Sequence, residues 1–282
     1  MSRRQVLSLG VGAIAAAGLG ACSGGTPSAE ASGVAKLTVE PGKLTIATGE
    51  PAYEPWVLGD EPESGKGFEA ALAYELAKRM GFAEEDVVWT RTTFEEAFAP
   101  GVHDWDLNMQ QVSINEDRKK AVDFSPGYFH PTQAVVVLAD GDYARTTSLA
   151  DLKDATIAVQ VGSTAFDYVK DLIKGGSEDG IEPFNDNADA AQAVSNGQAD
   201  AIVTDTPDAV VMASFGQIDN GVVVGQIEGT EDEFGLGVTL AKDSELTPYV
   251  TDAMNALIDD GTLEKLTDAW LAEYTTDIPV LV

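Results

Sequence analysis

Short strand-like runs alternate with amphipathic helical patterns from Lys43 to Tyr274, and this alternation limits the fold more than any other feature. Strand-like runs cover 43–49, 87–90, 107–113, 133–138, 156–159, 201–204, 222–224 and 237–241. Helical patterns cover 68–80, a short piece from 93, 164–173, 188–194, 206–212, 249–258 and 263–274. Such alternation is typical of an α/β fold with mostly parallel sheets flanked by helices. Because it falls into two series of roughly 100 residues each, we expect two lobes.

The charge balance excludes several classes of protein. Seventeen Lys and Arg face 47 Asp and Glu, a formal net charge of −30, which disfavours nucleic-acid binding. One Cys and two His give no intramolecular disulfide and predict neither a metal nor a cofactor. Acidic runs such as Glu231–Glu233 are expected to be solvated, and the low Lys content suggests a salty habitat.

The first residues have the layout of an export signal. Arg3 and Arg4 precede an apolar stretch, which is too short for a membrane span, and residues 19–22 read Leu-Gly-Ala-Cys. This ending resembles the bacterial lipobox, which implies a signal peptide at 1–21 and a lipid on Cys22. A plain secretory signal with an incidental Cys is the alternative. Residues 2–7 also resemble a twin-arginine export signal, although ordinary signal peptides often contain paired arginines. Residues 22–42 are predicted to be the lipidated Cys and a flexible Gly/Ser/Ala/Pro tether, which puts the domain outside the cytoplasm, anchored to the cell membrane.

Catalytic signatures are absent from the sequence. It contains neither Gly-x-Ser-x-Gly nor a phosphate-binding Gly-x-x-x-x-Gly-Lys-Ser/Thr motif. His103 and His130 have no partner at a spacing that suggests catalysis, so we expect surface or packing roles for them.

The stretch 104–128, DWDLNMQQVSINEDRKKAVDFSPGY, carries a resemblance to a known family. It resembles the run D-x-x-x-x-G-[MLIT]-[ST]-I-T-x-x-R…V-D-F-S-x-x-Y of the amino-acid-binding receptors of ABC importers, the family 3 solute-binding proteins. Further matches follow in the same order along the chain, at 67–73 (GFEAALA), 158–164 (AVQVGST), 199–205 (ADAIVTD) and 261–270 (GTLEKLTDAW). The resemblance implies a two-lobed type II periplasmic-binding fold, with lobe 1 at 43–132 plus 234–282, lobe 2 at 133–233, and a hinge of two crossing segments.

A free amino acid needs a fixed cation for its carboxylate and a fixed anion for its ammonium, because burying either alone is costly. Arg118 can offer a planar fork to a carboxylate, and Asp205 can accept from an ammonium. Ser113, Ser163 and Thr164 can add donors. The resemblance gives Ser113, Arg118, Thr164 and Asp205 these same roles. Their alternatives are a surface charge for Arg118, a strand-end hydroxyl for Ser113 and a helix cap for Asp205.

Residues that contact the ligand side chain are predicted in the loop after the first strand. Tyr53 and Trp56 are its aromatics, and Glu50 and Glu54 would favour a cationic side chain unless they belong to the general acidic surface. Gln111 stands where the family commonly has Gly, and it would fill part of the pocket or bond the ligand.

These observations predict a receptor that captures a free, polar or charged amino acid by hinge closure. It would deliver the amino acid to an ABC permease with its ATPase subunits, and we expect it to be a monomer. An enzyme on the same scaffold is the alternative, such as a dehydratase for a small carboxylate with Glu50 or Glu54 as general acid. A sensor domain is a third hypothesis.

Overall fold

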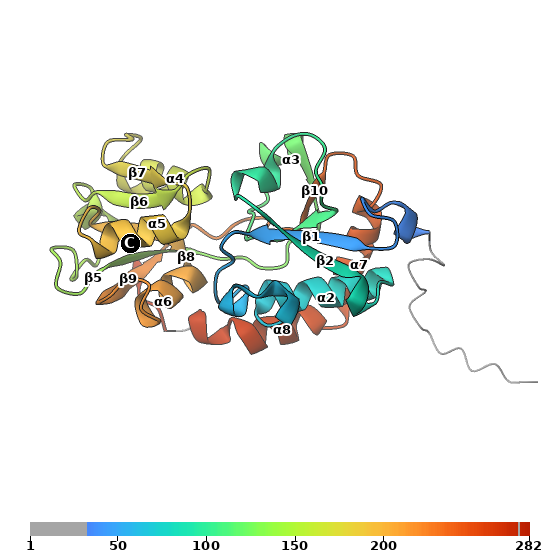
Figure 1. Ribbon diagram of the computed structural model, residues 1–282. Helices are drawn as coiled ribbons and strands as arrows, with labels where there is room; N and C mark the ends of the chain where they lie inside the picture. Colours follow the sequence, from blue (N-terminus) through green and yellow to red (C-terminus); the bar gives the residue numbers. More distant parts are fainter. Residues whose placement is uncertain (1–32, 276) are drawn as a thin grey trace, which may run out of the picture.

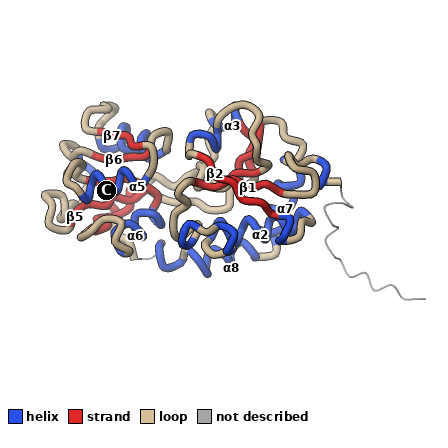
Figure 2. The backbone as a smooth tube through the Cα atoms, viewed as in Figure 1, coloured by secondary structure: helices blue, strands red, loops and turns tan. Residues whose placement is uncertain are grey.

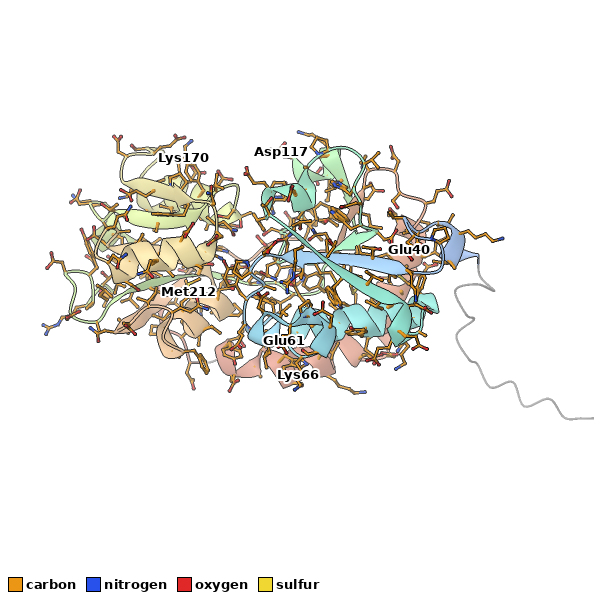
Figure 3. All side chains as sticks on the ribbon, viewed as in Figure 1. Glu40, Glu61, Lys66, Asp117, Lys170 and Met212 are labelled. Carbon is orange, nitrogen blue, oxygen red and sulfur yellow. The ribbon has the colours of Figure 1, made fainter. Side chains whose placement is uncertain are left out.

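The computed structural model describes residues 33–275 and 277–282, which form two α/β lobes side by side (Figure 1). The predicted signal peptide, Cys22 and most of the predicted tether lie outside the described residues. Strands occupy the middle of each lobe and irregular segments connect the lobes (Figure 2). Charged side chains such as Glu61, Lys66 and Asp117 project from the surface (Figure 3). Within the described part of the chain, every helix is too short or too polar to cross a bilayer.

Lobe 1 is built on a five-stranded sheet in the order β2-β1-β3-β10-β4. Its strands are β1 (Leu44–Gly49), β2 (Val87–Thr92), β3 (Leu107–Asn108), β4 (Val122–Phe124) and β10 (Thr239–Ala241). Helices α2 (Phe68–Met80), α7 (Thr247–Asp259) and α8 (Thr262–Trp270) pack below it in Figure 1. Short helical pieces in this lobe are Val34–Lys36, Leu58–Asp60, Pro62–Ser64, Glu84–Asp86, Glu95–Phe98, α3 (Arg118–Ala121) and Ala272–Tyr274.

Helix α2 follows the predicted pattern, and glycines flank it on both sides. The apolar residues 68, 72, 76 and 80 are buried in the core of lobe 1. Gly81 ends the helix in the left-handed conformation at φ 90°. Gly67, at φ 102°, precedes it where a Cβ would come within 2.4 Å of the Trp56 carbonyl oxygen. The Gly-Phe-Glu motif therefore lets the Trp56 loop lie directly on the start of α2.

Lobe 2 is built on a six-stranded sheet in the order β11-β9-β5-β8-β6-β7. Its strands are β5 (Gln133–Leu138), β6 (Ile157–Gln160), β7 (Ile181–Phe184), β8 (Ala201–Asp205), β9 (Gly221–Ile227) and β11 (Val280–Leu281). Its helices are Leu149–Leu152, α4 (Thr164–Tyr168) with the π-helical Val169–Ile173, α5 (Asn187–Ser195) and α6 (Thr206–Ser214). Alternate residues of β5 contribute to separate apolar clusters on the two sides of the sheet, Val135 and Val137 to one and Ala134 and Val136 to the other.

The mostly parallel sheets that we predicted are confirmed, and each sheet contains one reversed strand. Strand β10 runs antiparallel to β3 and β4, and β5 runs antiparallel to β8 and β9. Each of these strands is the first to follow a crossing from the other lobe. The chain then enters the sheet from the hinge end, so the strand runs opposite to those that a helix connects within the lobe.

The predicted boundary of lobe 1 at residue 282 is wrong at its C-terminal end. Strand β11 pairs in parallel with β9, and Leu281 is buried in the core of lobe 2. The chain therefore passes between the lobes near the two predicted segments and again between Tyr274 and Val280. The two predicted crossings lie side by side, with the Leu236 N–H donating to the Phe129 carbonyl oxygen at 2.7 Å.

The end of the predicted tether is also part of the fold. Val34 and Ala35 form a helical turn that is buried in the core of lobe 1. The Asp106 carboxylate accepts from the backbone N–H of Val39 at 2.7 Å and from that of Thr45 at 2.8 Å. This side chain joins the segment 33–42 to the first strand, so the lobe begins about ten residues before Lys43.

Candidate functional site

A cleft between the lobes contains two adjoining cavities. The Tyr53 compartment is lined by Thr48, Gly49, Glu50, Pro51, Ala52, Tyr53, Thr92, Thr93, Phe94, Gln110, Gln111, Gln160, Asn185, Asp186 and Asn187. The Asp205 compartment is lined by Phe94, Gln110, Gln111, Ser113, Gln133, Gln160, Ser163, Thr164, Ala165, Asn187, Val203, Thr204, Asp205 and Asp208. Each compartment has one wall from lobe 1 and one from lobe 2. Five residues, including Gln111, line both compartments.

Three predicted donors meet in the Asp205 compartment. Ser113 of lobe 1 and Thr164 of lobe 2 place their hydroxyl oxygens 3.5 Å apart across the cleft. The Ser163 hydroxyl lines the same cavity and donates to the Gln160 carbonyl oxygen at 2.7 Å. These side chains offer hydrogen bonds to a small polar group that enters between the lobes.

Asp205 ends strand β8 and lines this compartment without capping the helix that follows. It occupies the N-cap position of α6, but its side chain makes no cap hydrogen bond. Its Oδ1 accepts from Gln133 Nε2 at 2.5 Å. Burial raises the pKa of this carboxyl well above its usual range, and the charges of Asp208 and Asp232 raise it further. A cation in the cavity would therefore stabilise the ionised form.

Arg118 is buried behind Ser113 instead of lying on the surface. It is 7% exposed, and its guanidinium lies 4.4 Å from the centre of the Phe98 ring. One nitrogen donates to the Ser113 carbonyl oxygen and the other to that of Gly162 in lobe 2, both at 2.8 Å. Burial lowers its pKa to about 10, so it remains charged at neutral pH. Asn115, which replaces the family's usual Thr, accepts from the Arg118 N–H at 2.8 Å.

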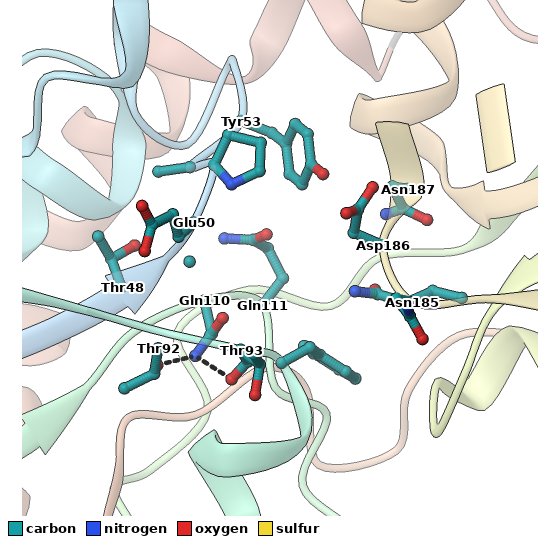
Figure 4. A pocket seen from close by; sticks show the side chains of 15 residues that line it. Thr48, Glu50, Tyr53, Thr92, Thr93, Gln110, Gln111, Asn185, Asp186 and Asn187 are labelled. Carbon is teal, nitrogen blue, oxygen red and sulfur yellow. Dashed lines mark hydrogen bonds between the residues drawn. The ribbon is translucent and has the colours of Figure 1, made fainter. Parts of the chain in front are cut away.

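The Tyr53 compartment contains the predicted Glu50 and Tyr53 (Figure 4). The Tyr53 hydroxyl accepts from the backbone N–H of Ala188 in lobe 2 at 3.3 Å. Burial raises the pKa of this hydroxyl, and the nearby Asp186 charge raises it further. Glu54 points away from the cavity lining and accepts from the Gly59 N–H at 3.1 Å.

The described residues that line the two compartments include four acids and no Lys or Arg. The acids are Glu50, Asp186, Asp205 and Asp208. Arg118 faces Asp232, Asp205 and Asp167, and Arg91, which donates to the Gly49 carbonyl oxygen at the Tyr53 compartment, is paired with Asp60. The cleft therefore has an excess of acidic groups. Burial raises the pKa of Asp205 and Asp208, so a positively charged ligand would stabilise their ionised forms.

Trp56 lies in the core and does not contact either compartment, contrary to its predicted role beside the ligand side chain. It is fully buried, packed edge-on against Phe68 and Phe129. Its indole N–H is directed at Asp208 in lobe 2. The Gly67 turn explains this position, because it lays the Trp56 backbone on the start of α2.

Glu69 is a buried acid at the cleft that we did not predict as a site residue. It sits in the first turn of α2 and accepts from the Tyr128 hydroxyl and from the Gln111 side chain. It also accepts from the Gln111 N–H at 2.9 Å. Burial raises the pKa of Glu69 to about 7, and these three donors offset part of the rise. The acid of the Gly-Phe-Glu motif was the signal in the sequence.

Gln111 has a left-handed backbone, at φ 57°. This explains why Gly is common at the position, since Gly adopts that conformation without strain. Here a Gln occupies it, held by Glu69 through both its backbone and its side chain. The side chain stands in the middle of the cleft (Figure 4), where it separates the two compartments.

The expectation of a solvated Glu231–Glu233 run is wrong for its central residue. Glu231 and Glu233 are exposed, whereas Asp232 is 7% exposed and its charge faces Arg118.

The two histidines have the packing contacts that we expected. The Asp232 carbonyl oxygen is 2.8 Å from His130 Nδ1, and His103 stacks on Trp105. Among the described residues no group of three His, Cys, Asp or Glu is arranged to hold a metal ion.

Comparison with known sequences identifies the group of proteins that this chain resembles. Residues 44–273 match the profile of the bacterial extracellular solute-binding proteins, family 3. The arginine-binding extracellular protein ArtP of Bacillus subtilis is 30% identical over 82% of this chain and 88% of its own length. The L-cystine-binding protein TcyJ of Escherichia coli is 28% identical over 86% of this chain and 88% of its own.

Solved structures give the same result. An ancestral arginine-binding protein bound to arginine matches with a TM-score of 0.66 and 30% identity, over 82% of this chain and 99% of the other. The ancestral amino acid-binding protein AncCDT-1, a precursor of cyclohexadienyl dehydratase, matches with a TM-score of 0.66 and 33% identity, over 81% and 95%. The expected type II periplasmic-binding fold is thereby confirmed.

Proposed function

Since the chain belongs to family 3 of the bacterial extracellular solute-binding proteins, we propose that it captures a free amino acid between its lobes and delivers it to an ABC permease. The cleft is the observation that carries this function. Ser113 from lobe 1 and Thr164 and Asp205 from lobe 2 line one cavity, with Arg118 directly behind it. A zwitterion would thus contact both lobes, and a ligand that contacts both binds the closed arrangement best.

The ammonium group is assigned to Asp205 and the carboxylate to the Ser113, Thr164 and Arg118 side. Asp205 carries the negative charge, and Gln133 holds its Oδ1 in place. Arg118 reaches a carboxylate by exchanging its bond to the Gly162 carbonyl oxygen, which belongs to the opposite lobe. Charge-assisted bonds of this kind are stronger than neutral ones, so the exchange favours the bound state.

The side chain of the ligand is assigned to the Tyr53 compartment, and its chemistry is cationic. Glu50 and Asp186 supply negative charge there, while Gln110, Gln111 and Asn187 supply amide groups. Arginine fits this set, because its guanidinium carries several donors and a positive charge. The names of the relatives ArtP and the ancestral arginine-binding protein support the same assignment.

Titration calorimetry with arginine, lysine, histidine, glutamine, cystine and glutamate tests the proposal. Arginine should bind with a dissociation constant of micromolar or tighter, about −8 kcal/mol or below, and glutamate should bind weakest. Asp205→Asn should weaken arginine binding at least tenfold, while Asp189→Asn, an exposed acid on the same lobe, should leave it unchanged. Tighter binding of glutamate than of arginine would refute the cationic assignment, and no binding of any amino acid would refute the function.

We also propose where the protein is located and which proteins it works with. We expect a lipid on Cys22 to hold a monomeric receptor at the outer side of the cell membrane, next to its permease and ATPase subunits. Cys22→Ala should release the protein from the membrane fraction, and light scattering should give the mass of one chain. Membrane retention of the Cys22→Ala protein would contradict lipid anchoring at this residue.

Dehydratase activity is the second candidate, because AncCDT-1 is described as a precursor of cyclohexadienyl dehydratase. AncCDT-1 itself is described as an amino acid-binding protein, and the named relatives above are binding proteins. We therefore favour binding without turnover. An NMR time course with each bound amino acid should show unchanged ligand, and appearance of a dehydrated product would favour the enzyme.

A further inference from the structure

One buried hydrogen bond joins a residue in the core of lobe 1 to a residue of lobe 2 at the edge of the cleft. The indole N–H of Trp56 in lobe 1 donates to the Asp208 carboxylate in lobe 2, with Nε1 at 3.1 Å from both oxygens. Trp56 is 0% exposed and Asp208 is 4% exposed. Asp208 also borders the Asp205 compartment, whereas Trp56 does not contact either compartment.

Both partners are held by rigid elements of their own lobes. The Trp56 ring packs between Phe68 at the start of α2 and Phe129. Asp208 lies in the first turn of α6, next to Pro207. A hinge opening that moves α6 away from the Trp56 ring would break this bond.

The bond combines a charged acceptor with exclusion of water. Burial raises the pKa of Asp208 to about 7, and the Trp56 N–H offsets part of that rise. Above this pH the carboxylate is ionised, and a hydrogen bond to an ionised group is stronger than a neutral one. Opening would expose the indole N–H and the carboxylate to water. Their hydrogen bonds to water would compensate only part of the free energy of the lost bond.

The other contacts between the lobes lie at the hinge, such as the bond from the Thr206 N–H to the Thr132 carbonyl oxygen, at the Phe215–Tyr274 contact, or close to the cavities. Ser113 faces Thr164 at 3.5 Å, and Tyr53 faces the Ala188 N–H at 3.3 Å. The Arg118 bond to Gly162 uses a group that the proposed function assigns to the ligand. A ligand would rearrange each of these contacts at the cavities, whereas the Trp56 side of the buried bond has no contact with the cavities.

We propose that the Trp56–Asp208 hydrogen bond is a latch that stabilises the closed arrangement of the lobes independently of the amino acid. Trp56 and Asp208 are then positioning residues, which raise affinity by increasing the fraction of molecules in the binding-competent arrangement. The effect on affinity rests on the proposed function, but the effect on closure does not.

Energy transfer between dyes on the two lobes tests the latch. Dyes on Lys78→Cys and Lys153→Cys, both at exposed lysines, report lobe separation in the full chain carrying Cys22→Ser. At about pH 8, where Asp208 is ionised, Trp56→Phe should lower the closed-to-open ratio about tenfold without added amino acid. Affinity for arginine, measured by calorimetry, should fall by up to the same factor.

Matched variants separate a latch from general destabilisation. Trp89→Phe removes an indole N–H whose bond, to the Tyr74 hydroxyl, stays within lobe 1, so it should not change the ratio. Asp189→Ala removes an exposed acid in the first turn of α5, the equivalent helix position, and serves as the control for Asp208→Ala. Should Trp56→Phe fail to fold, Asp208→Ala, made on the other lobe, tests the same bond.

The double variant supplies the deciding measurement. If the two residues act through one bond, Trp56→Phe and Asp208→Ala together should open the lobes no further than either alone. Additive effects, or single variants whose ratio stays within twofold of the parent, would overturn the latch. A parent that binds no arginine, together with variants whose closed fraction falls as expected, would count against the proposed function instead of the latch.

Discussion

At the residue scale, Glu69 shows how one buried acid organises the cleft wall. It holds the strained backbone of Gln111 and the Tyr128 hydroxyl at once. A strained conformation persists only where its surroundings hold it, and such conformations gather at functional sites. We infer that Glu69 keeps Gln111 in place as the partition between the two compartments.

Glu69→Gln should change how stability depends on pH. Burial raises the pKa of Glu69 to about 7, above its value in the unfolded chain. Its contribution to stability is therefore complete below about pH 4.5 and is lost as the pH rises through about 7. The variant should be on the order of 3 kcal/mol more stable relative to the parent at about pH 8 than at about pH 4, measured by urea unfolding.

Glu75→Gln, on the same helix but partly exposed, is the control. Its free energy of unfolding should differ from that of the parent by the same amount at each pH tested. The charged neighbour of Glu69 from the other lobe is Asp208, so the experiment should be repeated with Asp208→Asn. A constant difference between Glu69→Gln and the parent at all pH values would contradict the assigned protonation.

At the element scale, the segment 33–42 shows that a short irregular piece can be integral to a lobe. Its composition suggested a tether, but Val34 and Ala35 are buried and Thr38 is 6% exposed. Small residues and Gly indicate flexibility only if nothing packs on them. The partner that fixes this segment, Asp106, is far away in the sequence, so local composition could not reveal it.

Asp106→Ala should loosen this segment and destabilise the lobe. The change leaves the N–H groups of Val39 and Thr45 without their acceptor; Val39 is exposed, so the cost of about 1–3 kcal/mol for a buried group falls on Thr45. We expect about 2 kcal/mol lower stability in urea unfolding and faster amide exchange in 33–42. Asp104→Ala, at an exposed acid nearby, should change neither; equal effects of the two variants would count against the anchor.

Leu281→Ala should destabilise lobe 2, although residue 281 was predicted in lobe 1. Leu281 is 1% exposed in the core of lobe 2, and removing its side chain leaves a cavity worth about 2–5 kcal/mol. Val282→Ala, next to it and 73% exposed, is the control and should cost little. If the two variants melted at the same temperature, β11 would not be a structural part of that sheet.

The sequence predicted the elements much better than their connections. Periodicity located α2, α5, β5 and β8 within a residue or two, since these patterns depend on local burial. The reversed directions of β5 and β10, and the pairing of β11, depend on where the chain crosses between lobes, which no local pattern encodes.

For the candidate site, too, the sequence predicted the residues that local motifs mark and missed those whose surroundings come from a distant part of the chain. The motif spacing led to Ser113, Thr164 and Asp205 in one cavity, because each lies at or after the end of a strand that the fold directs at the cleft. Trp56 was misplaced, and Asp208 and the burial of Asp232 were missed, since their environments come from the opposite lobe or the hinge. Local sequence cannot distinguish an acid that another lobe buries from one that water surrounds.

At the scale of the whole molecule, the net charge of −30 is the dominant electrostatic feature. Like charges repel most strongly in the compact state, so folding brings an energetic cost that unfolding relieves. The pairs in the described residues, such as Lys43 with Asp86 and Lys242 with Asp123, neutralise only a few of the 47 acids. Dissolved cations must screen the remainder.

Salt should therefore raise the melting temperature. Between about 0.1 M and about 1 M NaCl the Debye length falls from about 10 Å to about 3 Å, so repulsion between surface acids is largely removed. Replacing the exposed Glu84 and Glu85 by Gln should raise the melting temperature most at low salt and so reduce its salt dependence. Because neutralising two acids and screening them act on the same repulsion, their effects should be less than additive. A melting temperature that stays constant or falls with salt, in the parent and the variant alike, would mean that the acidic surface does not limit stability and that its link to a salty habitat fails.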